Sequence, residues 1–293
     1  MKLFATDLDG TLLNSKHEIS KENINALKIA QENGVEIVIA TGRTYADAKA
    51  ICRQANICAH IISNNGSLAH SKNGEKLKVD TIDKKYVTET LGWFNDNRYF
   101  YEVSTAKNIF LPSNTKEILE NDFYKAKTKN LSLSKYTVDE IVSLLFSQEG
   151  VILVDDINDI VNADLDYCSI SAISFDEDKL SKGRELFGNH ESLSLVVSHE
   201  LNFELVNTNA SKGNSLEHLA NHLNIPLKDV AAIGDNYNDV SMFKRAGISI
   251  AMGNAKEDIK KICSYVSSSN DLHGVAHAIY KFMNNLKVES STA

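Results

Sequence analysis

The sequence predicts an α/β protein, with a Rossmann-like core built on a parallel sheet and an inserted α+β domain. The first third alternates short apolar runs with helical patterns, which is typical of βαβ units. From about Asp83 short strands follow one another closely, and after Val206 the first pattern returns. A chain of 293 residues is long enough for two domains. We therefore expect residues 1–82 and 207–293 to form the core, and residues 83–206 to form the insertion.

The first strand is expected at Leu3–Thr6, a mostly apolar run in front of a polar segment. Ser20 is a suitable N-cap for the next helix, because its hydroxyl can accept a hydrogen bond from a free backbone N–H of the first turn. Gly34 can end this helix in the left-handed conformation. The other elements expected before the insertion are the strands Val35–Ala40 and Ile61–Ser63 and a helix across Ala46–Ala55.

The insertion is expected to contain a sheet with antiparallel pairs and one solvated face, because apolar and polar residues alternate near residues 193–197 and 202–205. Its other expected elements are a helix through Val87, Leu91 and Phe94 and the strands Tyr99–Val103, Ile109–Leu111 and Ser169–Phe175. The core is then expected to continue with a helix through Leu216, Leu219 and Leu223 and the strands Val230–Ile233 and Ile248–Ala251.

Composition excludes several classes of function. The net charge of -8 disfavours nucleic acid and anionic membranes as partners, although it allows a small local anion site. The apolar runs are too short to span a bilayer, and the acidic N-terminal segment does not resemble a signal peptide. The cysteines, which are scattered without metal-binding spacing, indicate reduced thiols: Cys52, Cys58, Cys168 and Cys263. We therefore expect a cytoplasmic protein.

Four short polar segments are candidates for a functional site. Three of them directly follow predicted parallel strands, and their sequences are DLDGT at 7–11, TGR at 41–43 and GDNYND at 234–239. The fourth is SKG at 211–213, which opens a predicted helix. Open α/β sheets bind ligands beyond the carboxyl ends of their strands. We therefore expect these distant segments to converge on one edge of the sheet.

The residue types in these segments indicate a metal and a phosphate group. Carboxylates from Asp7, Asp9 and Asp235 would repel one another without a cation, and an oxygen-only set of ligands suits Mg²⁺ better than zinc. The groups that can hold phosphate oxygens are the Lys212 ammonium, the Thr41 hydroxyl, the Asn238 amide and the backbone N–H groups around Leu8 and Gly42. A carboxylate can also attack phosphorus. Asp7 would be that nucleophile, and Asp9, on the same side of an extended segment, would be the general acid and base.

Several of these residues also have ordinary structural interpretations. Asn65-Gly66 can be a tight turn or can line the site. Arg43 can reach a substrate or form a surface ion pair. Asp239 can orient metal-bound water or Lys212, or can stabilise a helix N-terminus. Thr11, at the end of the DLDGT segment, is a further supporting candidate.

The four segments together resemble the four motifs of the haloacid dehalogenase superfamily, in the same order. Three further stretches resemble its Cof-type subfamily, subclass IIB: AGISIAMGNA at 246–255, SND at 269–271 and GVA at 274–276. The resemblance extends over essentially the whole expected core. It leaves the insertion at the place where that subfamily has its C2B-type cap domain.

The resemblance implies that Asp7 is the nucleophile and Asp9 the general acid and base. It implies that Mg²⁺ is bound by the carboxylates of Asp7 and Asp235 and the backbone carbonyl of Asp9. It also implies a phosphate site made by Leu8, Thr41, Gly42, Lys212 and Asn238. Ser67 departs from the family pattern, which usually has a small apolar residue there, and this departure weakens any detailed role for the loop that contains it.

These observations predict a Mg²⁺-dependent phosphatase that hydrolyses small phosphate monoesters, such as sugar phosphates, through an aspartyl-phosphate on Asp7. One alternative is a phosphomutase of the same superfamily. A second is a signalling receiver module, which is much shorter and is phosphorylated on a middle strand. A third is a non-catalytic regulatory protein that binds phosphate and Mg²⁺, although no motif residue is missing. The sequence identifies neither the substrate nor the oligomeric state.

Overall fold

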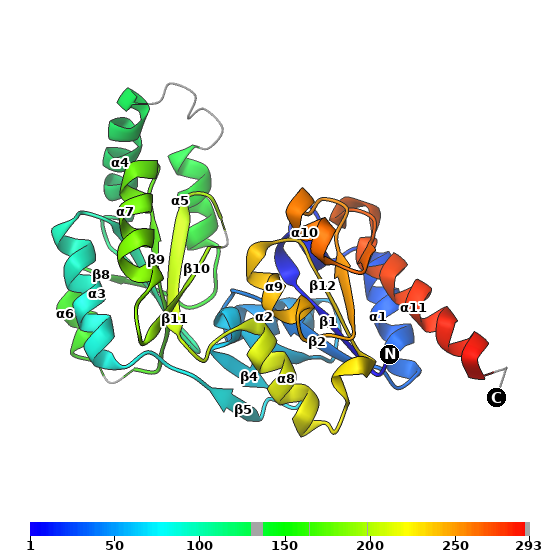
Figure 1. Cartoon of the computed structure of the whole chain (residues 1–293). Helices are drawn as coiled ribbons and strands as arrows, with labels where there is room; N and C mark the ends of the chain where they lie inside the picture. The colour runs from blue at the N-terminus through cyan, green and yellow to red at the C-terminus, as the bar shows by residue number, and fades with distance from the viewer. Residues whose placement is uncertain (130–136, 164, 198, 291–293) are drawn as a thin grey trace. The chain divides into compact units, whose positions relative to one another are not determined.

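The computed structural model describes residues 1–129, 137–163, 165–197 and 199–290. The chain divides into two compact units, which we call the core and the inserted domain. The core comprises Met1–Val79 and Ala210–Ala293, and the inserted domain comprises Asp80–Asn209 (Figure 1). Among the described residues, none of the helices combines the length and the apolar character that a bilayer-spanning segment needs.

The core is built on a sheet whose described strands follow the order β14-β13-β12-β1-β2-β3-β4-β5. The pairs from β14 to β3 are parallel, whereas β4 and β5 add an antiparallel edge. The strands are β1 (Leu3–Thr6), β2 (Glu36–Ala40), β3 (His60–Ser63), β4 (Leu68–His70), β5 (Lys76–Val79), β12 (Val230–Gly234), β13 (Ile248–Ala251) and β14 (Tyr265–Val266). β1 and β12 are buried along their whole length, as expected of central strands covered on both faces.

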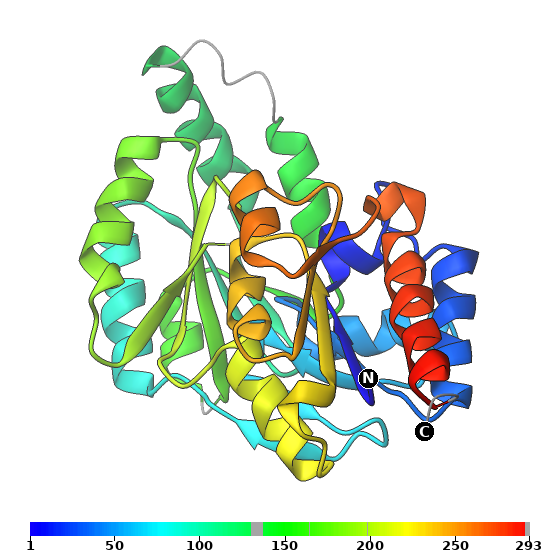
Figure 2. The same ribbon diagram turned by 45° about the vertical axis from the view of Figure 1, so that its right-hand side comes forward.

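Helices cover both faces of the core sheet. They are α1 (Lys21–Glu32), α2 (Tyr45–Gln54), α8 (Lys212–His222), α9 (Val240–Phe243), α10 (Glu257–Ile262) and α11 (Gly274–Ser290). α1 and α11 pack together on one side of the sheet, with α8 and α9 on the other (Figures 1 and 2). The predicted ends of the first helix are confirmed, because Ser20 accepts a hydrogen bond from the N–H of Asn23 and Gly34 has a φ of +81°.

The inserted domain contains a second sheet, in which the described strands follow the order β10-β11-β9-β6-β7-β8. Its pairs are antiparallel except for β7 and β8. The strands are β6 (Phe100–Thr105), β7 (Ile109–Pro112), β8 (Val151–Val154), β9 (Tyr167–Ile173), β10 (Leu193–Val196) and β11 (Asn202–Asn207). The helices are α3 (Lys84–Asp96), α4 (Thr115–Lys129), α5 (Val138–Phe146), α6 (Ile157–Val161) and α7 (Glu177–Gly188).

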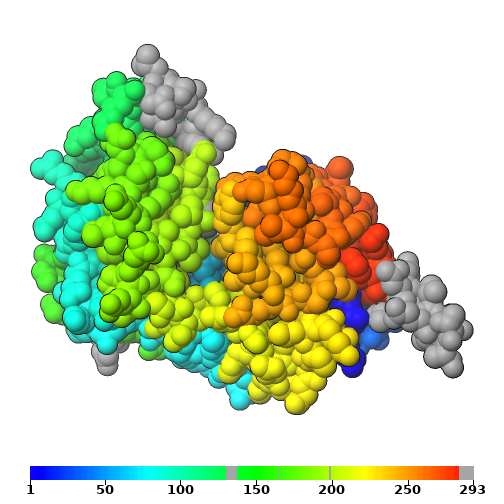
Figure 3. All heavy atoms as spheres, in the orientation of Figure 1, coloured from blue at the N-terminus to red at the C-terminus, as the bar shows by residue number. Residues whose placement is uncertain are grey.

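The expectation of one solvated face is wrong for part of this sheet. α3, α6 and α7 pack on one face, and the outer sides of α3 and α7 form the surface there (Figure 3). α4 and α5 supply Leu119 and Leu145 to a separate apolar cluster, which includes Phe100 and Leu111 of the strands. The physical reason is topological, since the parallel strands β7 and β8 need a crossover connection that returns along the sheet.

Candidate active site

Three polar segments lie at the carboxyl edge of the core sheet. Thr6 at the end of β1 is opposite Ile39 in β2 and Ile233 in β12. The residues that follow these three strands are therefore neighbours in space. They include Asp7 after β1, Thr41 after β2 and Asp235 after β12.

Lys212 is the buried cation beside Asp7. Its Nζ donates a hydrogen bond to Asp7 Oδ1 at 2.6 Å, and the residue is 1% exposed. Lys212 is the first residue of α8, and the Ser211 hydroxyl caps this helix by accepting from the N–H of Asn214 at 3.0 Å. The cap fixes the start of the helix. It thereby fixes the point from which the lysine side chain extends.

Asp239 orients Lys212. Its Oδ1 accepts a hydrogen bond from Lys212 Nζ at 2.7 Å. Its Oδ2 accepts from the backbone N–H groups of Asp235 at 3.0 Å and Asn236 at 3.1 Å. The side chain is fully buried. Because both carboxylate oxygens already accept hydrogen bonds, Asp239 positions the lysine and the Asp235 loop.

The carboxylates of Asp7, Asp235 and Asp239 lie within 4.8 Å of one another. Burial raises the pKa of Asp7 well above its ordinary value, and repulsion from Asp239 and Asp235 adds to this, although Lys212 opposes it. Burial, followed by repulsion from Asp239, raises the pKa of Asp235 to about 6. Burial lowers the pKa of Lys212, but attraction to Asp239 and Asp7 outweighs burial and raises it. The lysine therefore remains charged.

This group of residues fits a hard divalent cation. When all four are ionised, three carboxylates and one ammonium leave two negative charges, which one divalent ion would neutralise. No histidine or cysteine belongs to the cluster among the described residues, and carboxylate oxygens favour ions such as Mg²⁺. Thr11 donates a hydrogen bond to Asp235 Oδ1 at 2.9 Å and thereby orients that carboxylate.

The segment after Asp7 is a hydrogen-bonded turn rather than a continuous extended strand, although Asp7 and Asp9 themselves have extended backbone angles. The carbonyls of Asp7 and Leu8 accept hydrogen bonds from the backbone N–H groups of Leu12 and Leu13, and Gly10 has a φ of +75°. The turn separates the environments of the two acids. The Asp7 side chain is 8% exposed, whereas that of Asp9 is 48% exposed.

The same turn leaves backbone donors beside Asp7. The N–H groups of Leu8 and Gly42 donate to no acceptor among the described residues. Thr41 is 1% exposed, and its hydroxyl accepts from the N–H of Arg43 at 3.1 Å. Free backbone N–H groups in tight turns form anion-binding concavities. The geometry therefore suits a phosphate group between the ends of β1 and β2.

Asn65 both forms a tight turn and joins other candidate residues. It has a φ of +51°, and its Oδ1 accepts from Asn238 Nδ2 at 3.0 Å. A Cβ on Gly42 would lie 3.2 Å from Asn65 Nδ2, so this amide lies close to the TGR segment. The two interpretations of Asn65-Gly66 are therefore compatible.

Gly66 allows close packing between this turn and α8. It has a φ of +100°, and a Cβ there would lie 2.2 Å from the carbonyl carbon and oxygen of Ser211. The Ser215 hydroxyl donates to the Gly66 carbonyl at 2.7 Å. The approach to Ser211 is too close for any side chain. The Asn65 loop and the start of α8, which contains Lys212, therefore keep a fixed spacing.

Arg43 forms an ion pair with Asp9. Its Nε and Nη2 donate to the two Asp9 oxygens at 2.8 and 2.7 Å, and its Nη1 donates to Asp47 Oδ2 at 2.7 Å. Burial lowers the pKa of Arg43, but the hydrogen bonds and charges of Asp9 and Asp47 outweigh burial and raise it. Of the two interpretations of Arg43, the structure supports an ion pair, and its partner is the candidate acid and base.

Sequence reasoning gave no site role to Asp47 and Asn254. Asp47 lies three residues after Thr44, the N-cap of α2, and this helix-start spacing could have drawn attention to it. Asn254 Nδ2 donates to the Gly10 carbonyl at 2.8 Å, while its Oδ1 accepts from the N–H of Asn270. It therefore ties the turn after Asp7 to a distant loop, and no local pattern around Asn254 indicates this contact.

Comparison with known proteins gives consistent results. A family model described as haloacid dehalogenase-like hydrolase matches residues 4–279. "Phosphatase YwpJ" of Bacillus subtilis is 42% identical over 279 residues, covering 94% of this chain and 98% of the relative. "5-amino-6-(5-phospho-D-ribitylamino)uracil phosphatase YwtE" of the same organism is 31% identical, with coverages of 95% and 97%. A solved haloacid dehalogenase-like hydrolase from B. subtilis matches with a TM-score of 0.84 at 41% identity, covering 96% of this chain and 99% of that one.

Proposed function

Because the chain belongs to the haloacid dehalogenase-like hydrolase family, we propose that it is a Mg²⁺-dependent phosphatase that uses Asp7 as its nucleophile. The family and its phosphatase relatives support a phosphoric monoester hydrolase. The proposed substrates are small phosphorylated metabolites, such as sugar phosphates, and the proposed location is the cytoplasm. The inserted domain would act as the cap that selects among substrates.

The observation that supports this proposal most strongly is the environment of Asp7. The residue is buried, contacts Lys212, and lies in a cluster of three carboxylates and one ammonium, which leaves two uncompensated negative charges when all four groups are ionised. A structural ion pair would need one acid for one base. An excess of buried carboxylates is costly without a cation, and this excess favours a site that binds metal and then phosphate.

The residues that would hold Mg²⁺ are Asp7, Asp235 and the backbone carbonyl of Asp9. When bound, the ion would neutralise charge on the transferring phosphoryl group and bridge it to the protein. Asp239 would remain outside this set, because its oxygens already accept hydrogen bonds from Lys212 and two backbone N–H groups.

In the first step, an Asp7 carboxylate oxygen attacks the phosphorus of the monoester. A new bond forms between that oxygen and phosphorus, and the bond from phosphorus to the ester oxygen breaks. The N–H groups of Leu8 and Gly42, with the Lys212 ammonium, hold the phosphoryl oxygens. The Asn238 amide would also contact the phosphate, because its Nδ2 donates one hydrogen bond to Asn65 Oδ1 and keeps a second N–H for a ligand.

Asp9 would donate a proton to the departing alcohol and then accept one from the water that attacks the aspartyl-phosphate. That attack breaks the bond between phosphorus and the Asp7 oxygen, releasing inorganic phosphate and the free carboxylate. Both Asp9 oxygens accept from Arg43, so Arg43 must release Asp9 and the carboxyl group must take up a proton before it donates one; the later attack by water restores that proton. A dianionic phosphate can compete for the guanidinium, which would couple substrate binding to release of the acid.

Free phosphate released from a panel of sugar phosphates, nucleotides and pyridoxal phosphate would test the proposal. The native chain and Asp7→Asn would be assayed with Mg²⁺ and with a chelator, and Asp96→Asn, an exposed residue of α3, would be the matched control. We expect release that requires both Mg²⁺ and Asp7 and is unaffected by the control substitution.

Two outcomes would contradict the proposal. Isomerised sugar phosphate without free phosphate would indicate the phosphomutase. Absence of release from every compound by a folded, Mg²⁺-binding sample would favour the non-catalytic regulatory protein.

A further inference from the structure

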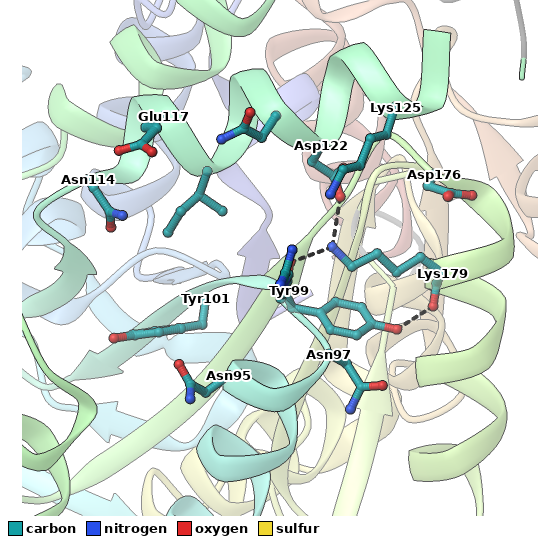
Figure 4. Close-up of a pocket in the computed structure, with 13 residues that line it drawn as sticks. Asn95, Asn97, Tyr99, Tyr101, Asn114, Glu117, Asp122, Lys125, Asp176 and Lys179 are labelled. Carbon is teal, nitrogen blue, oxygen red and sulfur yellow. Dashed lines mark hydrogen bonds and ion pairs between the residues drawn. The ribbon is translucent and has the colours of Figure 1, made fainter. Parts of the chain in front are cut away.

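The inserted domain contains a pocket whose lining includes none of the residues to which the proposed reaction gives a role. It encloses about 540 Å³, which is within the usual range for small-molecule sites. It lies where the sheet is incomplete, since β7 pairs with β6 only through Ile109 and Phe110 and then ends at Pro112, a residue without an N–H. The start of β6 is therefore left without that neighbour, beside Tyr101 (Figure 4).

The position follows a general rule for ligand sites. β7 and β8 are parallel and are joined through α4 and α5, so their carboxyl ends lie at the same edge of the sheet. Asn114, which lines the pocket, comes two residues after the end of β7. Ligands in open sheets with helical crossovers bind beyond the carboxyl ends of such strands.

One wall of the pocket is held rigidly. The Lys179 Nζ donates to Asp122 Oδ1 at 2.7 Å and to the Arg98 carbonyl at 2.6 Å, and it lies 4.6 Å from the centre of the Tyr99 ring. The other Asp122 oxygen accepts two more hydrogen bonds, from the Ser174 hydroxyl and the Phe175 N–H just after β9. Figure 4 shows this network along one side of the pocket. Lys179 and Asp122 therefore have a structural role, and their polar groups are not available to a ligand.

The rest of the lining presents polar groups that have no protein partner. Among the residues that the structure describes, the side chains of Asn95, Asn114, Asn121 and Glu117 make no hydrogen bond or ion pair. The Tyr101 hydroxyl also has none, although the residue is only 6% exposed. The hydroxyl oxygen itself is not buried, and Tyr101 lines the pocket. A ligand there can therefore donate a hydrogen bond to this hydroxyl or accept one from it.

The available charges indicate the sign of the ligand. Arg98 and Lys125 line the pocket, and their side chains form no ion pair with the described residues. Glu117 is the opposing free carboxylate, since Asp176 is paired with Lys129 at 2.7 Å. The free charges therefore have an excess of one positive charge. Amide side chains both donate and accept, which matches hydroxyl groups, and the Tyr101 ring adds an apolar surface.

We propose that this pocket binds a small polyhydroxylated anion, such as a sugar phosphate or a sugar acid, at a site whose lining contains no residue of the core. The Asn95, Asn114 and Asn121 amides and the Tyr101 hydroxyl bind the hydroxyl groups. Arg98 and Lys125 bind the anionic group. All of these residues belong to the inserted domain, and the site does not depend on the proposed phosphatase reaction.

Calorimetric titration of the full chain tests this proposal, with a chelator present so that metal-dependent binding near Asp7 is suppressed. The probes are glucose 6-phosphate, gluconate, glucose and inorganic phosphate. The variants are Lys125→Ala and Tyr101→Phe, with Lys127→Ala as the matched control on the same helix, outside the pocket lining. Asp7→Asn serves as the control for the other site.

We expect saturable binding of glucose 6-phosphate or gluconate, and weaker binding of glucose and inorganic phosphate. Lys125→Ala should weaken binding about tenfold and Tyr101→Phe about fivefold, as loss of a charged and a neutral hydrogen bond predicts. Lys127→Ala and Asp7→Asn should leave it unchanged. The anion that binds more tightly, glucose 6-phosphate or gluconate, shows whether the site prefers a phosphate or a carboxylate group. The proposal is overturned if neither anion binds, or if binding is lost in Asp7→Asn and unchanged in Lys125→Ala.

Discussion

The guanidinium of Arg43 binds both oxygens of the Asp9 carboxylate, at 2.8 and 2.7 Å. Such a two-point contact requires the planar fork of arginine and cannot be reproduced by lysine. Asp47 holds the third edge of the guanidinium at 2.7 Å. The geometry thus controls the position of the candidate acid and base through a residue that does not itself transfer a proton.

Arg43→Lys is therefore expected to lower kcat/KM for phosphate release by about tenfold or more, because lysine keeps the charge but can make neither the two-point contact that places Asp9 before substrate binds nor the two-point contact with phosphate that releases it. Steady-state kinetics with Mg²⁺ would measure this. Arg53→Lys, in the last turn of α2, is the matched control. An unchanged kcat/KM in Arg43→Lys would show that the Arg43 contact does not position Asp9 for the reaction.

Lys212→Met should destabilise the core strongly. The substitution leaves Asp7 and Asp239 buried without their cation, a loss that typically costs about 3–5 kcal/mol. Urea unfolding in the presence of a chelator would measure the loss, with exposed Lys244→Met as the control. If Lys212→Met lowers the free energy of unfolding by less than about 1 kcal/mol relative to Lys244→Met, the Asp7 and Asp239 carboxyl groups are protonated or solvated in the variant.

Metal affinity should fall as the pH is lowered through about 6. Burial and repulsion from Asp239 raise the pKa of Asp235 from 3.8 to about 6, so protons compete with the cation in this range. In the metal-free protein the free energy of unfolding depends on pH in the opposite direction. The stabilising contribution of the raised Asp235 pKa is fully present below about pH 3.8 and is lost as the pH rises through 6.

Calorimetric titration with Mg²⁺ at pH 5 and pH 7.5 would test this pH dependence. Native protein should bind about tenfold more weakly at the lower pH. Asp235→Asn should bind weakly at both values. Equal affinity of the native chain at the two pH values would contradict the role of Asp235 as a ligand that titrates near 6.

Gly66→Ala should destabilise the core by about 2–4 kcal/mol, since the added methyl would meet the Ser211 backbone and the φ of +100° disfavours any side chain. Thermal unfolding would measure the change. Gly92→Ala is the control, because nothing lies within 4 Å of the added atom in α3, and it should stabilise slightly. A neutral Gly66→Ala would mean that the loop can move away from α8 without cost.

The sequence predicted the elements whose patterns are local and strong. β1, β2 and β12 are short apolar runs followed by polar motifs, and the caps of α1 depend on Ser20 and Gly34 alone. β4, β5, β8 and the two-residue strand β14 were not predicted. β4 has only three residues, and β5 and β8 are largely exposed, so burial does not impose a clear alternation on them.

The candidate site was predictable in its membership but not in its pairings. That Asp7 and Asp235 belong together follows from parallel strands ending at one edge, whereas Lys212 is placed by the start of α8. Orientation of Lys212 by Asp239 was one of the predicted alternatives, but the choice between them, and the contact of Arg43 with Asp9, depend on side-chain directions after turns. The turn at Leu8–Leu12 is such a case, because no local sequence pattern predicts its two hydrogen bonds between residues five apart.

The place of β1 between β2 and β12 also matters while the chain is being made. The ribosome releases β1 and β2 early, whereas β12 begins only at residue 230. Until then the strand that precedes Asp7 has one neighbour and an open edge, although residues 80–209 have already emerged and can form their own sheet. The nascent N-terminal segment must therefore remain unaggregated through the synthesis of an entire domain. Its open edge is a predicted point of contact for ribosome-associated chaperones.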